Sequence, residues 1–127
     1  NPKEDFIQMP DAASFVDTPG CSATEGYYST LMHELVHWTG SKNRLKRFEL
    51  IAEQTEKHLD RYAREELVAE LGAAFLCAEF KLNTIEKTNH AAYIGSWLEA
   101  LKNDKSFIIP AANQASKAVR YLKDLTP

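Results

Sequence analysis

Two histidines and a glutamate, His33, Glu34 and His37, form the array H-E-x-x-H. On a helix, residues four apart share one face, so both imidazoles point the same way and can bind one metal ion. Glu34 then lies on an adjacent side, where it can act as a base towards an attacking water without being a ligand. This spacing predicts a hydrolytic site of the metallopeptidase type, with one Zn²⁺ per chain.

The residues around this array are apolar. They help to decide whether the histidines are solvated surface residues or metal ligands. On a surface helix both histidines would simply be solvated. Here they are embedded in a stretch that predicts a helix buried on most sides, where unpaired polar groups are costly. The apolar residues are Leu31, Met32, Leu35, Val36 and Trp38. This context favours a metal site.

Two histidines do not complete a catalytic zinc site, which takes three protein ligands and keeps one position open. Glu66 and Glu70 are four apart on a predicted helix over residues 61–82, beside apolar positions. We predict Glu66 as the third ligand and Glu70 as the acceptor of a ligand's imidazole N–H, with the reverse assignment left open. Glu65 is expected to face solvent. The competing interpretation is an acidic stripe exposed to water.

Another class of zinc peptidase can be set aside. Gly40 fits the pattern H-E-x-x-H-x-x-G-x-x-H, but Asn43 stands where the last histidine belongs. Both methionines, Met9 and Met32, precede the end of the array, so no later methionine turn follows. Tyr62, one helical turn before Glu66, is a candidate donor to the transition state, against a plain packing role.

The elements that must position these groups are mostly helical. Residues 5–9, closed by Pro10, predict one short edge strand. Ser22 and Glu25 form a capping-box pattern that opens the metal helix, and Gly40 is a candidate C-cap. Residues 41–60 predict a long loop with a helical turn. Further helices are expected over residues 61–82, 89–102 and 111–125, so the fold class is α+β, mostly α.

Bulk composition narrows the class of protein. The chain has 127 residues and a formal net charge of −3, which suits one domain over residues 1–127 and gives no basic footprint for nucleic acid. A basic run after the metal helix, Lys42, Arg44, Lys46 and Arg47, is expected to be a solvated loop. Two distant cysteines and the lack of a signal peptide or membrane span favour a cytoplasmic protein.

Beyond these arguments, the runs YYSTLMHELVHWTGSKNRLKR and YAREELVAELGAAFLCAEF, preceded by DFIQMP, resemble the zincin-like metallopeptidase domain of polyvalent proteins. That domain forms the C-terminal part of ArdC-type antirestriction proteins. The resemblance spans nearly the whole chain. It implies a gluzincin-like fold with His33 and His37 as zinc ligands, Glu34 as catalytic acid and base, and a glutamate of the EELVAE run as third ligand.

The resemblance also implies a setting on a mobile element. Relatives carry an N-terminal domain that binds single-stranded DNA, so we expect this chain to be a domain excised from a longer protein, with no nucleic acid bound by the domain itself. A peptide or protein is then the expected substrate. Two alternatives remain open: a zinc hydrolase of non-peptide amides, and a zinc-containing interaction module without peptidase activity. Oligomeric state and cleavage specificity do not follow from the sequence.

Overall fold

The computed structural model describes residues 1–55, 58–82, 102 and 105–125. The regular elements in these ranges are all helices. The elements are η1 (Ala12–Ser14), α1 (Ala23–Thr39), α2 (Arg47–Gln54), α3 (His58–Glu79), η2 (Lys105–Phe107) and α5 (Ile108–Asp124). The helix expected over 89–102 lies outside the described residues, apart from its last position.

Local signals fix the ends of α1, the helix that carries the H-E-x-x-H array. Ser22 accepts a hydrogen bond from the Glu25 amide while the Glu25 side chain accepts one from the Ser22 amide. The predicted capping box is therefore confirmed, and Gly40 is the C-cap. These contacts satisfy backbone groups that the helix ends leave without partners.

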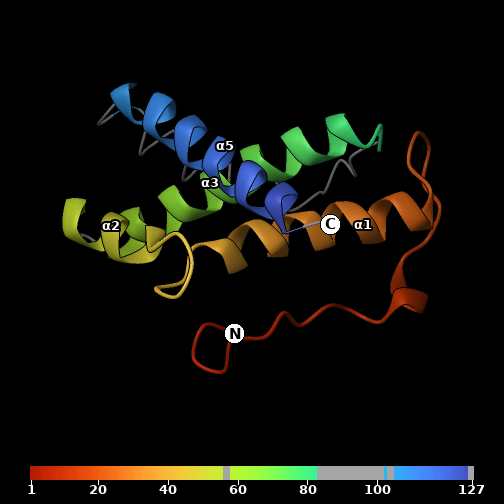
Figure 1. Ribbon diagram of the computed structural model, residues 1–127. Coiled ribbons are helices and arrows are strands. Elements are labelled where there is room, and N and C mark those ends of the chain that lie inside the picture. Colours follow the sequence, from red (N-terminus) through yellow and green to blue (C-terminus); the bar gives the residue numbers. More distant parts are fainter. Residues whose placement is uncertain (56–57, 83–101, 103–104, 126–127) are drawn as a thin grey trace.

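Three helices pack together around one core. In Figure 1, α5 crosses α3, and α1 contacts both of these helices. Small residues dominate the buried face of α5, since Ala111, Ala115 and Ala118 are almost fully inaccessible to solvent. Small side chains let helices approach closely, so α5 packs closely against α3 and also contacts α1. The core residues are Val36, Leu67, Val68, Ala69, Leu76, Phe107 and these three alanines.

One glycine sets the distance between α1 and α3. A Cβ atom at Gly72 would lie 2.8 Å from Cγ2 of Val36 and 2.9 Å from its Cγ1, closer than real Cβ atoms come. Val36 itself is completely buried. Because Val36 directly precedes His37, this contact holds the histidine face of α1 close to the glutamate face of α3.

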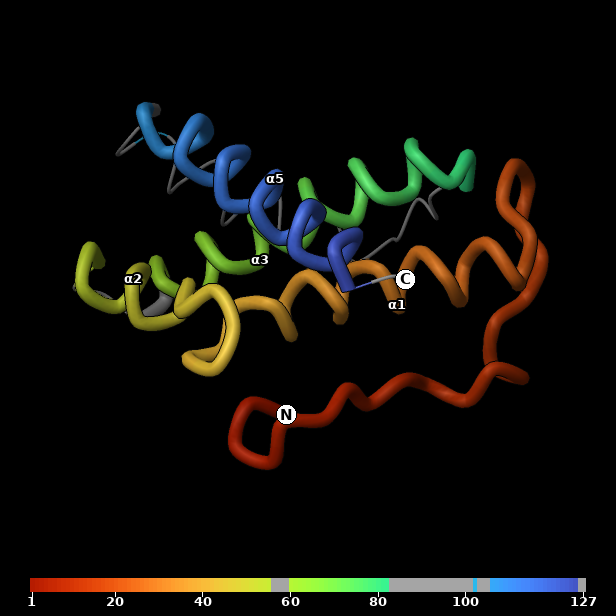
Figure 2. Tube along the Cα trace, in the orientation of Figure 1, coloured from red at the N-terminus to blue at the C-terminus, as the bar shows by residue number. Residues whose placement is uncertain are grey.

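The predicted N-terminal edge strand is wrong for the described residues. Residues 6–11 have no regular secondary structure, and no strand is found within the ranges that the structure describes. A strand needs a neighbouring strand to form its ladder of backbone hydrogen bonds. Figure 2 shows that this segment instead follows α1 at a distance. An ion pair between Asp5 and Arg44 ties it to the loop after α1.

Part of the long loop expected over 41–60 is regular structure. It contains α2 and the start of α3, and the irregular connection after α1 is confined to residues 40–46. The basic run of this connection was expected to be solvated, yet Arg47 is completely buried and only 8% of the Arg44 side chain is exposed. Among the described helices, none has the length and apolar character needed to cross a membrane.

We predict that Gly72→Ala destabilises the protein, by about 1–3 kcal/mol for an overpacked contact. In an unconstrained helix the same change is stabilising, since alanine is the better helix former. Chemical denaturation measures the difference. Val36→Ala in the same chain makes room for the new methyl group. The double variant should therefore lose less free energy of unfolding than the sum of the losses in the two single variants. A stabilised Gly72→Ala protein would show that the helices are not in contact here.

Candidate metal centre

Three side chains from two helices converge on one point. The Nε2 atoms of His33 and His37 lie 3.0 Å apart. Glu66 of α3 reaches them from the other side, with Oε1 3.0 Å from Nε2 of His37 and Oε2 3.5 Å from Nε2 of His33. Among the residues that the structure describes, His33, His37 and Glu66 form the one group suited to hold a metal ion.

The donor set fits a tetrahedral ion. Zinc–ligand bonds of about 2.0–2.1 Å place neighbouring donors of a tetrahedron about 3.3 Å apart. The two Nε2 atoms are 3.0 Å apart, and each has one of the two Glu66 oxygens at 3.0 or 3.5 Å. Two imidazole nitrogens and one carboxylate oxygen are also the donors of the His₂Glu zinc sites. The residues therefore match the predicted cofactor in type, number and spacing.

Glu70 lies behind the first histidine. Its Oε1 is 3.1 Å from Nδ1 of His33, the ring nitrogen that faces away from the donor cluster. The contact is within ion-pair distance, although Nδ1 makes no well-aligned hydrogen bond. This placement matches an outer carboxylate that orients a ligand, the role predicted for Glu70, whereas Glu66 faces the Nε2 atoms directly.

Glu65 occupies the equivalent place behind the second histidine, which differs from the expectation that it faces solvent. Its side chain is 13% exposed, and its Oε1 lies 3.0 Å from Nδ1 of His37. A carboxylate only accepts hydrogen bonds, so Nδ1 of His37 carries the proton and Nε2 is left to face the cluster. Each imidazole thus has its own carboxylate on the side away from the cluster.

The partner that permits Glu65 to be buried is Arg47. Its Nε donates to Oε2 of Glu65 at 2.8 Å and its Nη2 donates to Oε1 at 2.7 Å. The sequence did not predict this pair, because helical periodicity describes a single helix and carries no information on an arginine that belongs to another element. The one available signal was the basic run after α1, which could supply a cation to an acid-rich helix.

The charges of the cluster support one another. Burial lowers the pKa of His37, but hydrogen bonds with Glu65 and Glu66 outweigh it and raise that pKa to about 9. Burial also raises the pKa of Glu66, and hydrogen bonds from His33 and His37 outweigh that effect and hold it at about 2. Without metal at neutral pH, a protonated imidazole therefore neutralises the carboxylate where a cation would otherwise sit.

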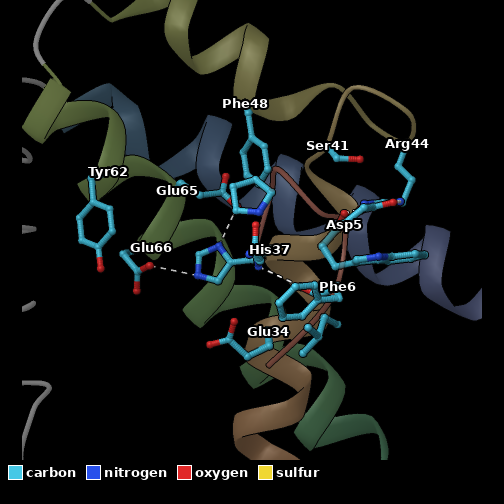
Figure 3. A pocket seen from close by; sticks show the side chains of 14 residues that line it. Asp5, Phe6, Glu34, His37, Ser41, Arg44, Phe48, Tyr62, Glu65 and Glu66 are labelled. Atoms are coloured by element: carbon cyan, nitrogen blue, oxygen red, sulfur yellow. Dashed lines mark hydrogen bonds and ion pairs between the residues drawn. The ribbon is translucent and has the colours of Figure 1, made fainter. Parts of the chain in front are cut away.

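A cleft of about 340 Å³ opens onto this cluster (Figure 3). Glu34, the predicted base, lines it together with His37 and Glu66, and is not a member of the donor group. Tyr62 lies on the same cleft and is half exposed. The structure thus brings the predicted base and the predicted donor to the rim of the cluster.

Apolar side chains form much of the cleft wall. Phe6 and Ile7 come from the N-terminal segment, while Trp38 and Phe48 flank the end of α1. Arg44 joins these two sides. It pairs with Asp5, donates from Nε to the carbonyl oxygen of Trp38 at 2.6 Å, and stacks its guanidinium 3.8 Å from the Trp38 ring centroid. The N-terminal segment is thereby held as one wall of the cleft.

Known proteins share this sequence over most of its length. An uncharacterized protein, y4eC, of Sinorhizobium fredii is 37% identical over 121 residues, and the match covers 95% of this chain and 36% of y4eC. DNA primase TraC of Escherichia coli is 38% identical over 116 residues, which are 91% of this chain and 10% of the primase. The chain thus spans a minor part of the curated relatives it matches.

Two solved structures share the fold. Both are of the antirestriction ArdC protein from plasmid R388, one metal-free (45% identity, TM-score 0.78) and one Mn(II)-bound (43% identity, TM-score 0.71). Each match covers 98% of this chain and 41% of the ArdC chain. The sequence profile of the zincin-like metallopeptidases matches residues 1–114. This chain belongs to the zincin-like metallopeptidase family, as a domain of the kind found in ArdC-like antirestriction proteins.

Proposed function

We propose that this domain is a zinc-dependent peptidase in which His33, His37 and Glu66 hold the ion. The observation that carries the proposal is the convergence of these three side chains beside an open cleft that His37 and Glu66 line. The two Nε2 atoms are 3.0 Å apart, and the two Glu66 oxygens lie 3.0 Å from that of His37 and 3.5 Å from that of His33. A purely structural zinc site is closed by four protein ligands, whereas three ligands beside a cleft leave a position for water and substrate.

Glu34 is the general base of this proposal. Zinc, when bound, lowers the pKa of a coordinated water to about 7. Glu34 lines the cleft, takes a proton from the attacking water and later gives a proton to the leaving amine. Tyr62, which lines the same cleft, donates to the oxyanion that develops in the transition state. The carboxylates behind the two imidazoles keep both rings oriented while this happens.

A peptide or protein is the substrate that suits the cleft. Much of its wall is apolar, which favours side chains such as those of leucine or phenylalanine. A chain with a net charge of −3 is a poor electrostatic match for nucleic acid. Any DNA binding by full-length relatives is assigned in this proposal to the parts that this chain does not cover.

A second candidate function is an antirestriction module that uses the metal site without cleaving peptides. The observation that favours it is that both solved relatives are antirestriction proteins. The two candidates differ in their need for Glu34. A binding module tolerates loss of this carboxylate, and a peptidase does not.

We predict that the zinc-loaded protein cleaves peptides and that Glu34→Gln lowers the rate by at least about 10²–10⁴-fold, because the amide cannot accept the proton. Mass-spectrometric detection of cleavage in a degenerate peptide library measures both proteins and reports the preferred side chains. Zinc content, measured in parallel, should be equal in the two proteins. Equal cleavage by wild type and variant would refute the role of Glu34, and no cleavage by either would favour the binding module.

We predict different losses of metal at the two glutamates of α3. Glu66→Gln removes a donor and should abolish zinc retention, whereas Glu70→Gln loosens only the orientation of His33 and should weaken binding roughly 10–100-fold. Competition with a chromophoric chelator gives both affinities, and repeating it with Mn²⁺ tests the choice of ion. The assignment is reversed if Glu70→Gln is the variant that cannot hold metal.

We predict that metal binding releases a proton from the site. The pKa of His37 is raised to about 9 in the metal-free protein, so the metal must displace a proton below that pH. Zinc affinity should therefore rise at least about tenfold per pH unit as the pH approaches 9 from below, and then level off. Calorimetry in two buffers of different ionisation enthalpy counts the protons. A buffer-independent heat at pH 7 would contradict the raised pKa.

The same pKa values give the sign of the pH dependence of folding without metal. The raised pKa of His37 contributes stability in full below about pH 6.5, and that contribution is lost as the pH rises through 9. The lowered pKa of Glu66 contributes above 4.5 and is lost as the pH falls through 2. The metal-free site is thus most stabilising between about pH 4.5 and 6.5.

A further inference from the structure

A guanidinium is buried behind the metal centre, and the family assignment does not explain it. Arg47 is completely inaccessible to solvent. Burying an arginine is costly unless its charge is paired and its donors are used. Here Nε and Nη2 bind the two oxygens of Glu65, Nη2 also donates to the carbonyl oxygen of Val36 at 2.7 Å, and Nη1 donates to Oγ1 of Thr39 at 3.0 Å.

Resting on the proposed metal site, we infer that Arg47 is a positioning residue for the metal centre, acting through Glu65 on His37. The guanidinium grips Glu65 in the two-pronged geometry that fixes a carboxylate in both position and orientation. The fixed Oε1 atom lies 3.0 Å from Nδ1 of His37, which turns Nε2 of that ring towards the donor cluster. A chain of contacts thus runs from the start of α2 to a metal donor.

The connection between α1 and α2 is shaped to deliver this arginine. Lys46 adopts a left-handed conformation, with φ of 55°, immediately before α2 begins. Gly40 leaves the space that the side chain needs, because a Cβ atom there would lie 2.8 Å from Nη2 of Arg47 and 2.6 Å from Cε1 of Phe48. A left-handed non-glycine residue is strained, and such strain persists only where surrounding contacts hold it in place.

The same arginine also ties α1 to α3. Its contacts to Val36 and Thr39 are made on the last turn of α1, and its contacts to Glu65 are made on α3. Two roles are therefore possible: a general brace between helices, or a specific hold on the imidazole of His37. An effect carried by the contacts to Val36 and Thr39 would reach the metal site without passing through Glu65, and a double-mutant cycle detects it.

The test measures Zn²⁺ affinity by chelator competition in Arg47→Met, Glu65→Gln and the double variant. Glu65→Gln should weaken binding about 10–100-fold and Arg47→Met about 10-fold. The double variant should be no weaker than Glu65→Gln alone, because Arg47 acts only through Glu65. Arg44→Met is the matched control: this nearly buried arginine of the same connection contacts Trp38 and Asp5, so zinc affinity should change less than twofold.

A spectroscopic readout identifies the ring that is affected. In the Co²⁺-loaded protein, the exchangeable N–H proton of each ligating imidazole gives a shifted proton resonance. Arg47→Met should shift and broaden the His37 resonance and leave the His33 resonance unchanged, since Glu70 still faces that ring. A brace between helices would move both resonances or neither.

Three results overturn the inference: unchanged zinc affinity in Arg47→Met, a double variant whose loss equals the product of the single losses, or an unaltered His37 resonance. If Arg47→Met does not fold, zinc affinity is measured in Arg47→Lys and in the double variant instead. Arg47→Lys keeps the positive charge, and the double variant removes both buried charges. Lysine cannot reproduce the two-pronged contact, so Arg47→Lys should bind zinc more weakly than wild type. A wild-type protein that binds no zinc would defeat the proposed function itself.

Discussion

Taking charge out of water is the constraint on which the centre of this molecule depends. Helix α3 carries three carboxylates within less than two turns that face α1: Glu65, Glu66 and Glu70. Buried anions are tolerated only when they are paired and hydrogen-bonded. The two imidazoles of α1 and the guanidinium of Arg47 supply the partners. Close packing of α1 on α3 and neutral charge are therefore achieved by the same set of contacts.

Patterns within a single helix predicted most of this centre. The spacing of His33 and His37, the spacing of Glu66 and Glu70, and the capping box at Ser22 all depend on backbone geometry that a helix sets by itself. The donor group of two histidines and Glu66 was named from the sequence alone, and the structure brings its atoms together. The catalytic and ligand roles of these residues remain predictions.

Contacts between elements were beyond such patterns. Glu65 was expected in solvent because a helical pattern says nothing about an arginine that approaches from a different helix. Arg47 was expected in solvent because a stretch with four basic residues in six positions usually stays hydrated. The strand over residues 5–9 failed for a related reason. Apolar residues before a proline describe an extended chain, but a strand also requires a neighbour, and in the described ranges the segment is held by an ion pair.

The short connection after α1 has a consequence for chain length. Surface connections usually accept inserted residues at small thermodynamic cost. This one is fixed at both ends, since Leu45 donates its amide to the Thr39 carbonyl, Phe48 donates to the Gly40 carbonyl, and the Arg47 side chain is anchored under α1. Any added residue must be accommodated between these anchors or withdraw the guanidinium from the carboxylate behind His37. In this domain the length of a loop is thereby linked to the geometry of the proposed metal site.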